Sequence, residues 1–201
     1  KPSSKAIHFF NQGKALILGG FYDGNVYLIP LEKKYSPVHS IPFIDQNPVT
    51  VIAFDQNEEF CFFGNDIGNI RVMIMDKDPN KWKYGRLITD QLSAISHIHC
   101  NSELNLWVSA SIDGYINLYT LPSSKLLRCI KVPTSYCDYV FLSSSPLPII
   151  IAITEEEKEG KQFSEIFVYS INGKKLNNDK ESTILTCPII IKDLNSNEYL
   201  T

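Results

Sequence analysis

Short apolar segments separated by polar turns recur along the whole chain and predict β-strands. These segments are rich in β-branched and aromatic residues and are bounded by Gly, Pro, Asn or Asp. No segment keeps apolar residues at the i, i+3, i+4, i+7 spacing over the length of an ordinary helix. The pattern therefore predicts an all-β chain, whose most continuous apolar strands are expected at 15–18, 60–63, 106–111 and 149–154.

One unit of this pattern repeats: a strand, a polar turn, a second strand, a tight turn with Asp and Gly, and a third strand. The turn glycines Gly24, Gly68 and Gly114 are 44 (68 − 24) and 46 (114 − 68) positions apart. Glycine after Asp supplies the positive φ that a tight hairpin needs. The aspartates of these turns are interpreted as turn builders that bond local backbone amides, not as a catalytic cluster: Asp23, Asp66 and Asp113.

A fourth, modified copy follows, and in it the charged segment 155–161 replaces the tight turn. Charged residues are costly to bury, so we expect an extended, solvated hairpin there. Weak outer strands, several of them bearing lysine, are expected at sheet edges. They are placed at 39–43, 86–89, 125–130 and 174–176.

A repeat of this length is typical of a β-propeller, in which each blade of roughly 40–50 residues is a four-stranded sheet. The predicted blades are 1–46, 47–92, 93–134 and 135–180, with a partial fifth blade over 181–201. We interpret the chain as an internal piece of a larger, seven-bladed ring. Such a piece has open edges, so we expect it to aggregate or to need a partner when expressed alone.

Two segments resemble known families. Residues 107–119, Trp-Val-Ser-Ala-Ser-Ile-Asp-Gly-Tyr-Ile-Asn-Leu-Tyr, resemble the core of a WD repeat, although Tyr119-Thr120 stands where Trp-Asp is usual and the Gly-His opening is absent. The runs 144–148 with 166–176, and 114–128, resemble the C-terminal propeller of BEACH-domain proteins, the neurobeachin and beige group. This resemblance implies a non-catalytic scaffold in vesicle or lysosome-related trafficking. It also implies a cytoplasmic protein, peripherally attached to endosomal or other vesicle membranes through the rest of its chain.

Two alternatives remain open. The chain is a WD-repeat adaptor of another assembly, in ciliary transport or as a substrate reader of a ubiquitin ligase, or it is an enzyme domain that uses the central channel. The enzyme alternative requires convergent polar side chains on the innermost strands. Phe9, Phe54 and Val140, which the pattern places there, are apolar. No nucleophile elbow, zinc-protease motif or phosphate-binding loop occurs in the sequence, so no catalytic residue and no cofactor are predicted.

Composition narrows the partners to proteins that bind through the faces and loops of the propeller. The net charge is −3 and the lysines are dispersed, which argues against nucleic acid. No apolar run approaches the ~20 residues of a membrane helix, so no direct membrane insertion is expected. The five cysteines are widely spaced and contain no Cys-x-x-Cys pair, so we expect a protein of the reducing cytosol.

His97 and His99 lie two residues apart, on one face of a predicted strand, and Cys100 follows them. Such a pair can form part of a metal site, but a third ligand at a recognisable spacing is missing. We therefore favour packed or edge histidines and predict no metal ligand.

The segment 76–85 is the candidate partner-binding surface, because it places aromatic residues between lysines in a polar loop. Its predicted contact residues are Lys81, Trp82, Lys83 and Tyr84. The alternative, which we favour for Trp82, is that its ring folds back over the outer edge of its own blade.

Overall fold

The structure is a computed structural model that describes residues 4–20, 22–31, 39–42, 46–134, 136–158 and 161–176. Nearly all regular structure in these residues is β-strand, joined by two single-turn 3-10 helices, η1 (Ser4–Ala6) and η2 (Pro79–Lys81). The predicted all-β class is confirmed. The strands are β1 (Ile7–Phe10), β2 (Ala15–Gly19), β3 (Val26–Pro30), β4 (His39–Ile41), β5 (Val49–Phe54), β6 (Phe60–Asn65), β7 (Ile70–Ile74), β8 (Lys83–Ile88), β9 (Ile95–Asn101), β10 (Leu106–Ser111), β11 (Tyr115–Thr120), β12 (Leu126–Lys131), β13 (Tyr139–Ser143), β14 (Ile149–Lys158) and β15 (Lys161–Ser170).

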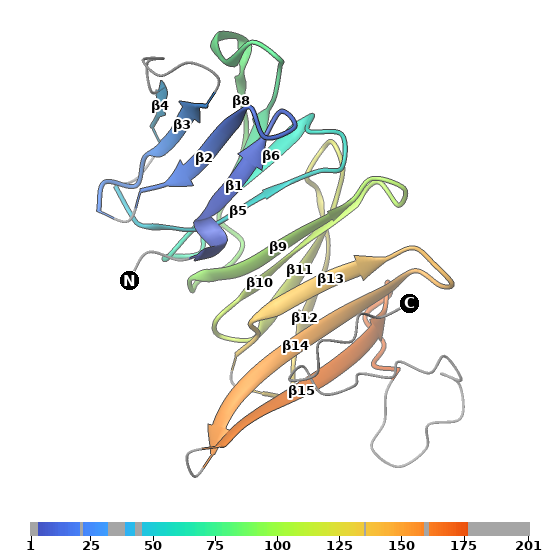
Figure 1. Ribbon diagram of the computed structural model, residues 1–201. Helices are drawn as coiled ribbons and strands as arrows, with labels where there is room; N and C mark the ends of the chain where they lie inside the picture. The colour runs from blue at the N-terminus through green and yellow to red at the C-terminus, as the bar shows by residue number, and fades with distance from the viewer. Residues whose placement is uncertain are drawn as a thin grey trace.

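These strands form four antiparallel sheets in which neighbours along the chain are neighbours in the sheet (Figure 1). The first three sheets are β1–β4, β5–β8 and β9–β12, and the fourth contains β13, β14 and β15. The prediction of a fourth strand at 174–176 is wrong for the described residues. There the chain turns at Gly173 (φ +82°), and pairing is limited to a bridge between Tyr169 and Lys175 and one hydrogen bond from Leu176 N to Val168 O.

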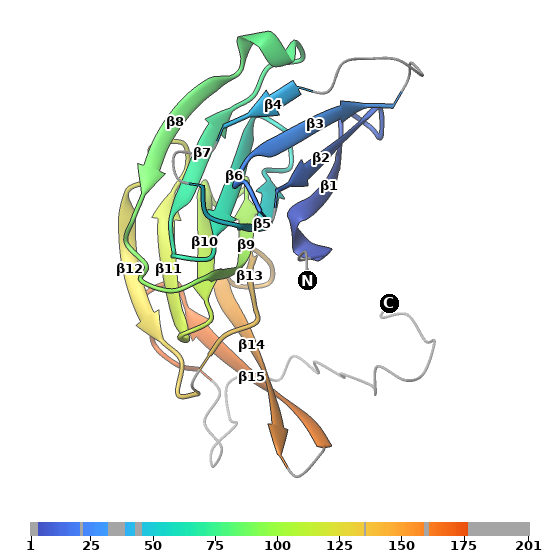
Figure 2. The ribbon, with the colours of Figure 1, turned by 90° about the vertical axis from the view of Figure 1, so that its left-hand side faces the viewer.

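The sheets lie face to face in chain order (Figures 1 and 2). We call β1, β5, β9 and β13 the inner strands, because they lie along one side of the stack, and β4, β8 and β12 the outer strands. A hydroxyl of each of two inner strands, β5 and β9, bonds a backbone carbonyl in or just before the next inner strand. Thr50 Oγ1 donates to Ile95 O (2.6 Å), and Ser96 Oγ donates to Cys137 O (2.5 Å).

Small residues let successive sheets approach closely next to the inner strands. Gly19 and Gly64 occupy equivalent positions in their sheets, paired with Val26 and Ile70 respectively. A Cβ at Gly19 would lie 2.6 Å from a methyl of Val49, and one at Gly64 would lie 2.8 Å from Cβ of Ile95. Hence neither position accepts a side chain unless the next sheet moves away.

Apolar side chains fill the space between each pair of successive sheets. Between the second and third sheets, the Trp107 ring packs 4.7 Å from Phe62 and 4.2 Å from Tyr119, measured between ring centroids. All three side chains are fully buried. Both faces of the second and third sheets are covered, which explains why their middle strands read as continuous apolar runs.

The tight turns are built on glycine as predicted, since Gly24, Gly68 and Gly114 all have positive φ. The predicted role of the aspartates holds only for Asp23, which accepts a bond from Asn25 N (3.1 Å). Asp66 precedes its glycine by two residues rather than one, and Asn65 performs this role instead, accepting from the amides of Ile67 and Asn69. Asp113 accepts from the hydroxyl of Ser111 (2.5 Å).

The predicted extended hairpin in the fourth sheet is confirmed, because β14 and β15 pair from Ile149↔Ser170 out to Lys158↔Lys161. The predicted fifth blade over 181–201 lies outside the described residues. Among the described residues, no helix is long and apolar enough to cross a membrane.

Candidate functional site

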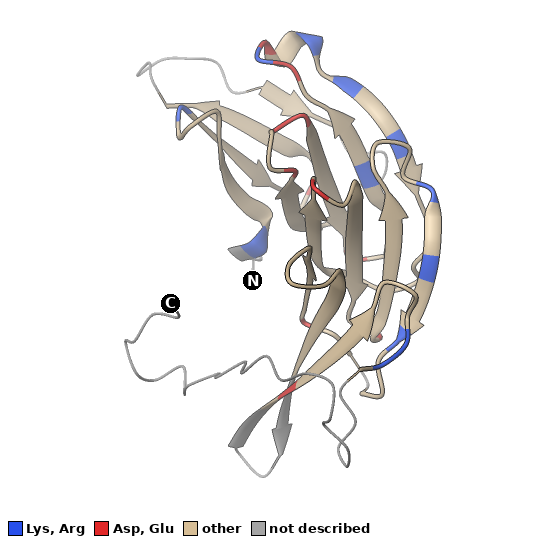
Figure 3. Cartoon of the chain, turned by 90° about the vertical axis from the view of Figure 1, so that its right-hand side faces the viewer, with Lys and Arg blue, Asp and Glu red and all other residues tan. Residues whose placement is uncertain are grey.

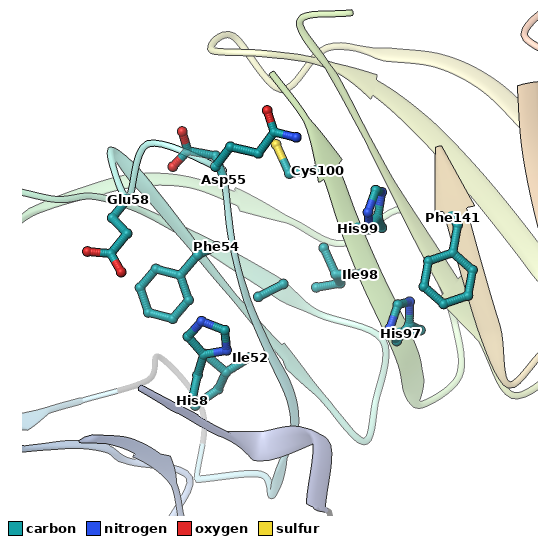
Figure 4. A pocket seen from close by; sticks show the side chains of 12 residues that line it. His8, Ile52, Phe54, Asp55, Glu58, His97, Ile98, His99, Cys100 and Phe141 are labelled. Carbon is teal, nitrogen blue, oxygen red and sulfur yellow. The ribbon is translucent and has the colours of Figure 1, made fainter. Parts of the chain in front are cut away.

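The inner strands enclose a hollow of about 470 Å³ (Figure 4). Residues from all four inner strands and from the β5–β6 turn line it. The lining side chains that carry polar or aromatic groups are His8, Phe54, Asp55, Gln56, Glu58, His97, His99, Cys100 and Phe141. The expectation of an apolar lining is therefore only partly right. Phe54 lines the hollow, but Phe9 and Val140 do not, and three histidines do.

His97 and His99 lie on the same face of β9, as predicted, and both contact β13. The Nδ1 atom of His97 lies 2.9 Å from Val140 O, and that of His99 accepts a hydrogen bond from Leu142 N (3.1 Å). Phe141 packs against both rings, with centroid distances of 5.1 and 5.5 Å. The two imidazoles thus fasten the third sheet to the fourth through backbone groups of β13.

Burial keeps these two imidazoles neutral. It lowers the pKa of His97 to about 4, an effect that the bond to Val140 O only partly offsets and that Lys5 and His99 reinforce. Burial also lowers the pKa of His99. A neutral ring is what the geometry requires, because a protonated Nδ1 of His99 would direct an N–H at the N–H of Leu142.

The carboxylates that line the hollow accept hydrogen bonds from backbone amides in or beside turns. Asp55 accepts bonds from the backbone amides of Asn57 (3.1 Å) and Phe60 (2.6 Å), and Glu58 accepts one from Asn11 N (3.0 Å). No group of three or more His, Cys, Asp or Glu residues suited to a metal ion occurs in the described part of the chain. Asp55, Glu58 and the two histidines of β9 thus make structural bonds between the sheets and within their turns.

His8 was not singled out in the sequence. Its ring stacks on Phe54 of the second sheet with a centroid distance of 4.6 Å, and burial lowers its pKa despite the nearby Glu58. His8 shares a face of β1 with the buried Phe10, and this spacing was the available signal, but the sequence does not indicate which face of an inner strand borders the hollow.

The predicted contact residues at 81–84 lie at the end of η2 and the start of the outer strand β8. Lys81, Lys83 and Tyr84 are exposed. Trp82 folds back, since its ring meets Phe10 of the first sheet edge-on at 5.5 Å and its Nε1 donates to Asp76 O (2.7 Å). The structure therefore does not gather the four residues into one exposed cluster.

A buried polar network in the third sheet also escaped the sequence analysis. Gln91, in the loop before β9, accepts a bond from Ser109 Oγ (2.5 Å) and donates through Nε2 to Ser111 Oγ (3.0 Å). All three side chains are buried. The pattern Ser-x-Ser within an otherwise apolar buried strand was the signal, because buried hydroxyls need partners. The network ties the preceding loop to the middle of the third sheet.

The four cysteines in the described residues, Cys61, Cys100, Cys129 and Cys137, are free thiols, and Cys187 lies outside those residues. Burial raises the pKa of Cys100 and of Cys137 to about 12, so neither provides a reactive thiolate at neutral pH. No protein-family model matches the chain.

Proposed function

We propose that the chain is part of a WD-type β-propeller that acts as a non-catalytic scaffold for protein partners. The repeated way in which one sheet meets the next supports the propeller. In the second sheet, Ile52, Phe63 and Met73 face the first sheet and are buried. The positions in the first sheet that match them by register are Ile7, Leu18 and Ile29.

In the described part of the chain, no other sheet covers this outer face of the first sheet. Ile7 is 46% exposed and Phe9 is 63% exposed, although the equivalent positions of the second sheet pack against a neighbour. An apolar sheet face with this register fits another sheet of the same construction, as a ring of blades supplies.

The open face allows a direct test of whether this sheet normally packs against another blade of a ring. We expect the 201-residue chain to self-associate in sedimentation velocity and Phe9→Asp to reduce that association, because the substitution charges the open face. Phe54→Asp changes the equivalent residue on the covered side and should instead destabilise the fold. A wild-type chain that stays monodisperse and melts cooperatively would contradict the ring.

Protein binding is supported chiefly by one rim of the stack, formed by the β2–β3, β6–β7 and β10–β11 turns and the β8–β9 loop. We call it the turn rim. Large apolar side chains at its turns and loop stand in solvent: Tyr22 is 92% exposed, Leu92 is 90% exposed, and Ile67 and Ile112 are about half exposed. Exposed apolar groups repeated along one rim are suited to protein contact.

The experiment compares proteins labelled in cells around the parent protein and its variants. Ile67→Asp combined with Leu92→Asp should remove a specific subset of neighbours. Leu147→Asp is the matched control, because Leu147 is an exposed apolar residue of the β13–β14 loop at the opposite rim. Identical neighbours for all proteins would count against the turn rim as the binding face.

Within this function, we favour a BEACH-domain parent in vesicle or lysosome-related trafficking, at cytoplasmic membrane surfaces. Support comes from the residues 114–128, 144–148 and 166–176 that resemble that family. The sequence that precedes this chain in its gene decides between this parent and an adaptor of another assembly. A BEACH domain there supports trafficking, and its absence excludes this assignment.

A further inference from the structure

Basic residues gather along the outer strands of the second and third sheets (Figure 3). β8 and β12 are each the edge strand of their sheet, and they follow one another along the convex side of the stack (Figure 2). Arg86 links them, because its Nη1 donates to Ser124 O just before β12 (3.0 Å). The two edges therefore form one continuous surface.

This surface has a charge opposite to that of the chain as a whole. Residues 81–89 and 125–134 contain no Asp or Glu, whereas the chain carries a net charge of −3. We call their six exposed basic residues the basic edge: Lys81, Lys83, Arg86, Lys125, Arg128 and Lys131. The expectation of dispersed lysines does not hold here, because the fold brings two distant segments together.

Within the described residues, no side-chain carboxylate bonds to the basic edge, although Asp90 and Asp113 lie close enough to influence Cys129 of β12. Arg86, Arg128 and Lys131 direct their nitrogens to backbone carbonyl oxygens, those of Ser124, Leu127 and Asp113 respectively. A carbonyl satisfies a donor but leaves the positive charge in place. Uncompensated charges of one sign raise the local potential and attract anionic groups.

Two further properties of the surface limit the kind of partner. Edge strands present unpaired N–H and C=O groups that an extended chain can bond. Apolar groups lie between the charges, since Tyr84 is 54% exposed and Leu126 and Leu127 are more than a third exposed. The surface thus offers charge, backbone pairing and apolar contact together.

We propose that the basic edge binds an extended acidic segment of a partner protein, which pairs with β12 or β8 as an added strand. This rests on the proposed function only in that the ligand is a protein. A peptide fits better than a bilayer, because the edge is convex and a flat surface would contact only part of it (Figure 3). A bilayer would also leave the strand edges unpaired.

A competing explanation is that these basic residues only prevent sheet edges from pairing with other chains, as lysine commonly does on edge strands. The two explanations differ in what neutralisation changes. A protective role predicts more aggregation and no change in acidic peptide binding. A binding role predicts loss of that binding.

The test measures fluorescence anisotropy of a labelled peptide that alternates Glu with Val, against the same peptide with Gln for Glu. The protein is the full chain. We expect only the acidic peptide, and not its Gln counterpart, to bind, with an affinity that falls as the salt concentration rises. Lys83→Gln combined with Arg128→Gln should weaken it about tenfold, the loss of two partly screened ion pairs.

The matched control is Lys14→Gln combined with Lys77→Gln, which removes the same charge from the β1–β2 turn and the loop before η2. It should bind within about twofold of wild type, because long-range charge effects are screened. Equal loss in both double variants would overturn the site and leave only net charge. No preference for the acidic peptide would overturn it as well.

Two probes separate the remaining outcomes. An acidic peptide with alternate amides N-methylated keeps its charge but cannot pair as a strand, so it should bind more weakly, and equal binding would refute strand addition. Vesicles of equal phosphatidylcholine and phosphatidylserine test the bilayer: binding to them without peptide binding would overturn the proposal. Because turn-rim labelling is independent of this surface, the scaffold function can survive failure of the basic edge.

Discussion

The contact between the third and fourth sheets should weaken as the solution becomes acidic. His97 and His99 hold β13 through neutral rings, and burial lowers the pKa of His97 from 6.5 to about 4. The unfolded chain, with the ordinary pKa, binds more protons between these two values. Stability is therefore full above about pH 6.5 and is lost progressively as the pH falls towards 4.

The magnitude follows from the two pKa values of His97. The pKa of His97 is 6.5 in the unfolded chain and about 4 in the folded one. Lowering the pH from 7.5 to 5.0 therefore reduces the unfolding free energy by about 2 kcal/mol. His99 contributes in the same direction, since burial lowers its pKa too. A loss of this size is a substantial part of the stability of an ordinary domain.

The assay is urea unfolding of dilute protein at both pH values, followed by the fluorescence of Trp107, which is fully buried. Carboxylates also titrate in this range, so the comparison is with His97→Gln, which should lose about 2 kcal/mol of the pH dependence. His39→Gln is the control, because His39 lies on the outer strand β4. If His97→Gln keeps the whole pH dependence of wild type, the reasoning is refuted.

Two further substitutions test the packing. Gly68→Ala should lower the unfolding free energy by about 3 kcal/mol, because φ is +93° and the new Cβ would lie 2.4 Å from Gln91 O. Gly13→Ala, at φ +82° with no atom within 4 Å, should cost only about 1 kcal/mol, and equal midpoint shifts in urea would contradict the clash. Trp82→Ala should cost about 2–3 kcal/mol in thermal unfolding through lost packing on Phe10, whereas a freely exposed anchor would cost almost nothing.

The strands were predictable because they depend on local patterns. β10 (Leu106–Ser111) coincides with its predicted span, and the tight turns follow their glycines. The fourth sheet was harder, because pairing beyond Gly173 is short and a strand needs more than one bridge. Segment length and turn residues determine where a strand lies in the sequence. Whether an edge strand pairs with its sheet depends on neighbouring strands that the local sequence does not specify.

The site residues were less predictable, because their partners are distant in the sequence. His97 and His99 contact backbone atoms 43 positions away, and Trp82 contacts a ring 72 positions (82 − 10) away. Nothing local distinguishes a histidine that bonds the next sheet from one that binds a metal. The favoured alternative for Trp82 expected the ring to fold back over the outer edge of its own blade; the ring does fold back, but it packs on Phe10 of the preceding sheet.

Repetition explains why this chain offers surfaces with separate chemistry. Each of the first three sheets places its inner strand, its turn at the turn rim and its outer strand in the same three positions, so a residue type that recurs in the repeat accumulates on one surface. The outer strands β8 and β12 accumulate basic residues and the turn rim accumulates apolar ones, as Arg86 with Arg128 and Ile67 with Ile112 illustrate. Substitutions on one surface leave the others largely unchanged, because positions this far apart act nearly additively. Partner binding at the turn rim and at the basic edge should therefore be separable by mutation. A variant that changes both surfaces should weaken each of the two interactions by the same factor as the variant that changes that surface alone.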